Sequence, residues 1–147
     1  MELWLRILAL SAGGALGVNA RYWLTAAIER WAGARWPWAT FLINVSGSFL
    51  IGVAATCLTR RDPHALSRLF LITGFLGGYT TFSTFALEIR TLGMRSQFAD
   101  SLTYGVGSVL AGVLAVVLGV ATAQALQTTA VEPPTAGAKV EGDRPLG

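Results

Sequence analysis

The chain has 147 residues, enough for one domain, with 53% hydrophobic residues, only 13% charged residues and a mean hydropathy of +0.55. Because soluble domains carry about 25% charged residues, this composition excludes an ordinary soluble enzyme, and the apolar content excludes a disordered protein. The net charge of +3 is scattered and gives no reason to expect nucleic acid as a partner, while a single Cys57 and a single His64 argue against a disulfide framework, a metal centre built on these residues and a catalytic triad.

Four apolar segments are each long enough to cross a membrane, which takes about 20 residues in a helix. We predict spans at residues 3–28, 38–58, 69–87 and 102–126, so residues 1–127 form an all-α membrane channel domain. Pro37 and Pro63 lie in the first two connections, where helices should stop. Arg6 and Arg21 interrupt the first span near its two ends, whereas the connections carry most of the other charges of the domain, with Glu88 and Arg90 after the third span. Residues 128–147 are predicted to be a disordered tail rich in Pro, Gly and charge.

The first span raises the question of a signal peptide, because Asn19 and Ala20 resemble a small-residue cleavage site. Glu2 is a poor start for a positively charged leader, and no soluble domain follows. We therefore interpret the segment as a membrane helix.

The Lys/Arg distribution sets the orientation of a membrane protein, and here it is nearly balanced. Four spans put both ends of the domain on one side. The arginines nearest the spans divide as Arg6, Arg60, Arg61 and Arg68 on that side, and Arg30, Arg35, Arg90 and Arg95 on the other. A weak bias permits insertion in both orientations, and hence an antiparallel dimer. A single orientation set by a slight excess is the alternative, and the sequence leaves both open.

The third span departs from an ordinary membrane helix in residues 74–85, which read GFLGGYTTFSTF. Gly77 and Gly78, followed by the β-branched Thr80 and Thr81, are poor helix formers, so we predict a break near the bilayer midplane. Carbonyls freed in lipid need partners, and carbonyl ends favour a cation. The alternative is close helix packing through small residues, with the hydroxyls bonded back onto their own helix.

Phe82 and Phe85 are three residues apart and share a helix face. The adjacent face carries Ser83 and Thr84, so the two rings border a polar seam. Because a phenyl ring has a positive edge, such rings can line a path for an anion without charging the membrane interior. Lipid contact or core packing is the simpler interpretation.

The neighbouring spans carry polar stripes with i, i+4 spacing: Thr40, Asn44 and Ser48 on the second, and Tyr104 and Ser108 on the fourth. An asparagine inside a membrane is a functional candidate by default, although interhelical hydrogen bonding would also explain it. These groups are neutral donors, and no Asp, Glu or Lys falls in the middle of a predicted span. The pattern favours passive conduction of an anion over proton coupling.

At this point the sequence resembles the Fluc family of fluoride channels. The likeness extends over about residues 5–126 and is strongest in three signatures: residues 74–85 in the third span, residues 13–17 with Arg21 and Tyr22 in the first, and Asn44 with Gly47, Ser48, Phe49 and Gly52 in the second.

The resemblance implies a fluoride-specific channel, not an enzyme, that passively exports fluoride and lowers its cytoplasmic concentration. It implies a dual-topology antiparallel homodimer with two pores in the inner (plasma) membrane. It also implies a structural sodium ion at the dimer centre, held by the backbone carbonyls of Gly77 and Thr80. By position, the pore residues fall on Asn44, Phe82 and Phe85, and the fourth-helix polar track on Tyr104 and Ser108.

Two other classes remain as alternatives. A proton-coupled exporter of the small multidrug type needs a membrane-embedded carboxylate, whereas Glu29 and Glu88 are predicted at span ends. A structural subunit that only packs against partners would not need Asn44, the hydroxyl string and the phenylalanine pair together.

Overall fold

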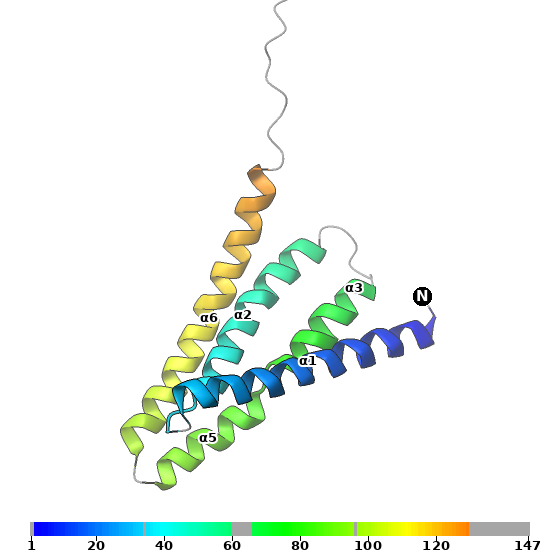
Figure 1. The fold of residues 1–147 in the computed structure, drawn as a ribbon. Coiled ribbons are helices and arrows are strands. Elements are labelled where there is room, and N and C mark those ends of the chain that lie inside the picture. Colours follow the sequence, from blue (N-terminus) through cyan, green and yellow to red (C-terminus); the bar gives the residue numbers. More distant parts are fainter. Residues whose placement is uncertain (1, 34, 60–65, 96, 130–147) are drawn as a thin grey trace, which may run out of the picture.

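The computed structural model describes residues 2–33, 35–59, 66–95 and 97–129, whose regular secondary structure is entirely helical (Figure 1). Four helical segments are long and apolar enough to cross a membrane: Leu3–Ala32, Trp38–Leu58, Leu66–Met94 and Phe98–Thr129. The prediction of an all-α protein with four spans is confirmed. The predicted tail from residue 130 onward lies outside the described residues.

The helices follow one another as α1 (Leu3–Ala32), α2 (Trp38–Thr59), an interrupted third span, and α6 (Phe98–Thr129). The third span consists of α3 (Leu66–Arg68), the π-type segment η1 (Leu69–Leu76), α4 (Gly77–Tyr79) and α5 (Phe82–Met94). In Figure 1, α2 runs beside α6, and α1 crosses the third span. Gly33, with φ of 74°, ends α1 and turns the chain toward α2.

Glycines let the helix backbones touch at two seams. A Cβ atom added to Gly13 or Gly17 on α1 would overlap the carbonyl oxygen of Phe70 or Phe75 on η1. A second seam joins α2 to α6, where a Cβ on Gly119 would overlap the Phe49 carbonyl oxygen. Close approach through small residues is the usual way in which helices associate in lipid. On the third span itself, a Cβ on Gly78 would lie 2.8 Å from the Gly14 carbonyl oxygen on α1. Close packing through small residues, the alternative for this span, therefore occurs together with the break.

The third span breaks at Thr80 and Thr81, whose backbones are extended, with φ/ψ of −81°/160° and −150°/118°. The paired glycines before them stay helical, and Gly77 has φ/ψ of −65°/−35°. The predicted interruption is therefore present, two residues after the glycines. It follows η1, a wider π-type segment of a kind often found at functional sites.

The helix after the break is longer than predicted. α5 continues to Met94, so Glu88 and Arg90 lie on this helix and not in a connection. Their assignment to a connection was wrong. The physical reason is that charge alone does not end a helix: no Pro or Gly occurs between Thr81 and Gly93, and most residues there are compatible with a helix.

Candidate functional site

Asn44 on α2 holds the extended segment of the third span in place. Its Oδ1 accepts a hydrogen bond from the Thr81 N–H, and its Nδ2 donates to the Thr81 carbonyl, each at 2.9 Å. One side-chain amide thus satisfies both main-chain groups of a residue that has left the helix, where lipid offers no water to do so. Since the Nδ2 group has two hydrogens, one is left for another acceptor.

The break also redirects two N–H groups away from their helical acceptors. Thr81 N–H bonds to Asn44 and not to the carbonyl of Gly77, four residues earlier. Thr84 N–H bonds to the Thr81 hydroxyl at 3.2 Å, a helix cap, and not to the carbonyl of Thr80. The carbonyls of Gly77 and Thr80 therefore lose their helical partners. These are the two positions at which the resemblance to the fluoride channels implies cation ligands.

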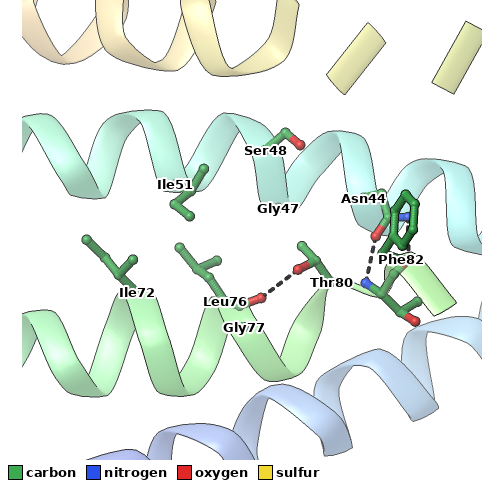
Figure 2. A pocket seen from close by; sticks show the side chains of 10 residues that line it. Asn44, Gly47, Ser48, Ile51, Ile72, Leu76, Gly77, Thr80 and Phe82 are labelled. Atoms are coloured by element: carbon green, nitrogen blue, oxygen red, sulfur yellow. Dashed lines mark hydrogen bonds between the residues drawn. The ribbon is translucent and has the colours of Figure 1, made fainter. Parts of the chain in front are cut away.

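A cavity of about 270 Å³ lies beside the break, between α2 and the third span (Figure 2). In Figure 2, Ile51 and Ile72 lie at one end of this cavity, and Asn44 and Phe82 lie at the other. Gly77 and Thr80 also line it. The cavity thus brings the loosened backbone next to the predicted pore asparagine.

A second cavity of about 300 Å³ lies between α2, α5 and α6, and it contains five of the predicted pore residues: Asn44, Ser48, Phe82, Phe85 and Ser108. Asn44, Ser48 and Phe82 line both cavities, so the two spaces are neighbours. The Ser108 hydroxyl is buried and has no hydrogen-bond partner among the described residues. A buried polar atom without a partner is costly, which suits a position where a water or ligand binds.

The two phenylalanines lie in different environments. Their ring centroids are 5.8 Å apart, but Phe82 is 79% exposed in the protomer and Phe85 only 7%. Phe85 contacts Tyr104 edge to face at a centroid distance of 5.2 Å. Phe85 is therefore part of the protomer's core, whereas Phe82 projects from it beside the cavities.

Thr40 and Tyr104 are brought together by Glu88 and do not line the two cavities just described. Thr40 Oγ1 donates to one oxygen of Glu88 at 2.8 Å, and the Tyr104 hydroxyl donates to the other at 2.6 Å. Thr40 and Tyr104 are buried, and Glu88 is half-buried. The three residues tie α2, α5 and α6 together immediately behind Phe85, since Tyr104 touches that ring.

Glu88 is the residue that sequence reasoning missed. Its spacing from Thr84 and Phe85, four and three residues, places it on the side of α5 that carries both. That spacing is the available signal, but a predicted third span that ends at residue 87 leaves Glu88 outside it. In the structure, Glu88 lies inside the third span, Leu66–Met94, although towards its end and not in its middle.

Ser83 and Thr84 stay near the break but do not join the five residues of the second cavity. Both are exposed in the protomer, and their hydroxyls lie 3.4 Å and 3.0 Å from that of Thr81. Thr84 lines a third cavity, whose lining does not include Phe82 or Phe85. Within the residues the structure covers, no group of three His, Cys, Asp or Glu residues could hold a metal ion.

Comparison of the sequence with known proteins assigns the chain to a family. A model of the family described as "CrcB-like protein, Camphor Resistance (CrcB)" matches residues 8–120. A relative from Nitrobacter winogradskyi is 45% identical over 119 residues, which is 80% of this chain and 94% of the relative. One from Solibacter usitatus is 46% identical over 116 residues, 78% of this chain and 95% of the relative.

A relative from Rhizobium meliloti is 44% identical over 121 residues, 82% of this chain and 97% of the relative. All three relatives carry the name "Fluoride-specific ion channel FluC". Ion channels are not enzymes, so the prediction that this protein is not an enzyme is confirmed. The matched residues include all of α2, the whole third span with its break, and most of α1 and α6. The chain therefore belongs to the CrcB family of fluoride-specific ion channels, as a multi-pass membrane protein.

Proposed function

We propose that this protein is a channel that passively exports fluoride, and that Asn44, Ser48, Phe82, Phe85 and Ser108 line its path. The observation that carries this proposal is the second cavity, where these five residues meet and where the buried Ser108 hydroxyl has no hydrogen-bond partner in the part of the chain that the structure describes. Its polar lining groups are neutral hydrogen-bond donors. Such groups can replace part of the water around a small anion without binding it so tightly that it cannot leave.

The two phenylalanines supply the apolar part of the path. The edge of each ring carries partial positive charge, so an anion that passes along the edges of Phe82 and Phe85 meets favourable electrostatics in the plane of each ring. Their centroids are 5.8 Å apart, so one small anion can touch both edges in turn. Asn44 then offers its remaining Nδ2 hydrogen from the opposite helix.

The protomer leaves this path open on one side, which supports a second chain as its wall. Phe82 is 79% exposed, and the hydroxyl residues Ser83 and Thr84 beside it are also exposed. Hydroxyls and a cavity suit lipid poorly. We propose an antiparallel homodimer with two paths. The nearly balanced arginines on the two sides of the membrane permit the two opposite orientations that such a dimer needs. Tags on the C-terminus should be accessible on both sides of the membrane, and a single orientation with full activity would contradict this dimer.

Sodium is the cation that we propose at the dimer centre. The carbonyls of Gly77 and Thr80 have lost their helical partners, and two chains would supply four such oxygens. Neutral carbonyl oxygens with no charged ligand suit a hard, singly charged ion better than zinc or a transition metal. A bound sodium ion would supply a fixed positive charge between the two paths and so favour anions in both.

The cellular setting that we propose is the inner (plasma) membrane. Hydrogen fluoride is a weak acid that crosses membranes as a neutral molecule and dissociates inside the cell. A passive anion path lets the negative interior potential drive fluoride out and lowers its cytoplasmic concentration.

One observation favours the other candidate, a proton-coupled exporter: Glu88 is a half-buried carboxylate on a membrane helix. Both of its oxygens already accept hydrogen bonds, from Thr40 and Tyr104, so it is occupied in holding three helices together. We therefore assign Glu88 a positioning role in the channel.

The test is efflux from liposomes that contain the purified protein. Fluoride should leave rapidly once a potassium ionophore balances the charge, chloride should stay, and protein-free liposomes should hold both ions. Fluoride movement that requires a proton gradient would favour the exporter, and retention of fluoride would contradict both candidates.

A further inference from the structure

A third cavity, of about 320 Å³, extends along α5 from Thr84, the residue before Phe85, to Arg95 just after the end of the helix. It is bounded by the end of α1, the connection that leads into α2, and α5. Its charged and hydroxyl-bearing lining residues are Glu29, Arg35, Thr84, Glu88, Thr91 and Arg95. The other two cavities carry no charged residue in their lining, so this space differs in kind.

The polar residues of this cavity form a stripe along α5. Thr84, Glu88 and Thr91 follow one another at spacings of four and three residues, and Arg95 follows four residues later, just after the helix ends at Met94. Such spacing keeps them on one helix face. The stripe therefore leads from the hydroxyl cluster at the break to an exposed guanidinium.

Opposite charges are distributed unevenly along this route. Glu88 lies at the inner end, where Thr40 and Tyr104 hold it, and Glu29 lies exposed at the outer end. Arg35 and Arg95, both exposed, line the same space. An anion that approached the two carboxylates alone would be repelled, whereas the two guanidinium groups reverse the sign of that interaction at the outer end.

We propose that this cavity is the mouth at which an anion is captured before it reaches Phe85, and that Arg35 and Arg95 set the rate of capture. The inference rests on the proposed function, because the anion in question is the conducted one. Charged clefts raise the local concentration of oppositely charged ions and accelerate their capture by factors of about 10 to 1,000. The effect is screened by salt, over about 10 Å at 0.1 M ionic strength and about 30 Å at 0.01 M.

The same two arginines could instead bind the phosphate of a lipid headgroup, since an anion is the shared ligand. The experiment therefore measures single-channel current in planar bilayers of an uncharged, phosphate-free galactolipid, with sodium fluoride as the only salt. At about 10 mM fluoride, a variant carrying Arg35→Gln and Arg95→Gln should pass roughly one third to one tenth of the normal current. At about 1 M fluoride, the two currents should agree within about twofold.

Matched variants separate capture from a structural role. Arg90→Gln removes the same charge from α5, but Arg90 does not line the cavity and contacts Met94 instead, so its current should stay normal at both concentrations. Glu29→Gln should raise the current at low fluoride, which damage to the fold would not do. Arg35→Lys with Arg95→Lys keeps both charges and should restore most of the current.

Three results would overturn the assignment. The first is an equal loss in the double glutamine variant at low and high fluoride, and the second is an equal loss in Arg90→Gln. The third is a loss that occurs only in bilayers with anionic phosphatidylglycerol, which would assign the arginines to a headgroup phosphate. A lack of fluoride current in the unaltered protein would overturn the proposed function as well, whereas the three results above leave that function standing.

Discussion

The Asn44 side chain has two roles, and the sequence indicates only the first of them. It lines both cavities beside the break, and it also makes two hydrogen bonds to the main chain of Thr81. The second role explains why an amide is needed, because only a group with a donor and an acceptor side by side can satisfy both groups of one residue.

Asn44→Asp tests this assignment. The aspartate can still accept from the Thr81 N–H, but its second oxygen would face the Thr81 carbonyl, with two acceptors in contact. We expect a loss of about 1–3 kcal/mol in stability together with loss of fluoride efflux. Thermal unfolding in detergent and efflux from liposomes measure the two effects. Ser48→Ala, which alters the same cavities without touching Thr81, should lower efflux and leave the unfolding temperature unchanged.

Phe82 is the better of the two phenylalanines for testing an electrostatic role. Because it is 79% exposed in the protomer, Phe82→Ile leaves no void in the core, whereas Phe85→Ile also removes the contact with Tyr104. We expect Phe82→Ile to slow fluoride efflux about tenfold while the stability of the protomer stays unchanged. A tenfold change in rate corresponds to the loss of one contact between the anion and a ring edge worth about 1.4 kcal/mol. Phe98→Ile, at a residue 74% exposed, is the control and should conduct normally. Equal efflux from both variants would show that the ring edge has no role.

Among the helices, the seam between α1 and the third span depends on particular glycines. Gly13 and Gly17 face η1 with no room for a Cβ atom, whereas Gly14 on the same helix has nothing within 4 Å. The three glycines look equivalent in the sequence, but in the structure Gly13 and Gly17 have no room for a Cβ atom and Gly14 has.

Gly17→Ala and Gly14→Ala should therefore behave differently. In Gly17→Ala the new methyl group would overlap the Phe75 carbonyl and push α1 off η1, at a cost of about 1–3 kcal/mol. Gly14→Ala should be neutral or slightly stabilising, because alanine favours a helix. Thermal unfolding in detergent measures both, and equal unfolding temperatures would contradict the backbone contact.

The helices illustrate how far sequence patterns reach. Hydropathy predicts four spans, and the glycines with the Thr-Thr-Phe-Ser-Thr-Phe string predict the interruption, because both signals are local. The position of the break is not local: Gly77 is helical, and Thr81 is extended because Asn44, 37 residues away in the sequence, binds it. The role of Glu88 likewise depends on Thr40 and Tyr104, which only the folded chain brings to its two oxygens.

For the assembled molecule, Gly77 distinguishes the protomer from the proposed dimer. A Cβ atom there would meet only the Ile72 carbonyl oxygen, at 3.8 Å, so the protomer has room for it. Its helical backbone does not require glycine either. The protomer thus gives no reason for glycine at this position, and we propose that the reason lies at the face where a second chain and a sodium ion would meet.

Gly77→Ala should accordingly give a protomer with normal helix content that dimerises less and conducts less. Size-exclusion chromatography with light scattering measures the dimer, and efflux measures conduction. In the unaltered protein, exchange of sodium for a large organic cation should lower efflux, and EDTA should have no effect. A Gly77→Ala protein that remains dimeric and active, or efflux that is indifferent to exhaustive sodium removal, would count against the site.

Passive conduction of fluoride is the central claim, and the reversal potential of the current across a planar bilayer tests it most directly. With a tenfold gradient of fluoride and equal pH on both sides, the account predicts a reversal potential of about 59 mV in magnitude, set by fluoride alone. Adding a pH gradient or replacing the other anions with chloride should leave it unchanged. A reversal potential that moves with the pH gradient, or that follows chloride, would contradict the account.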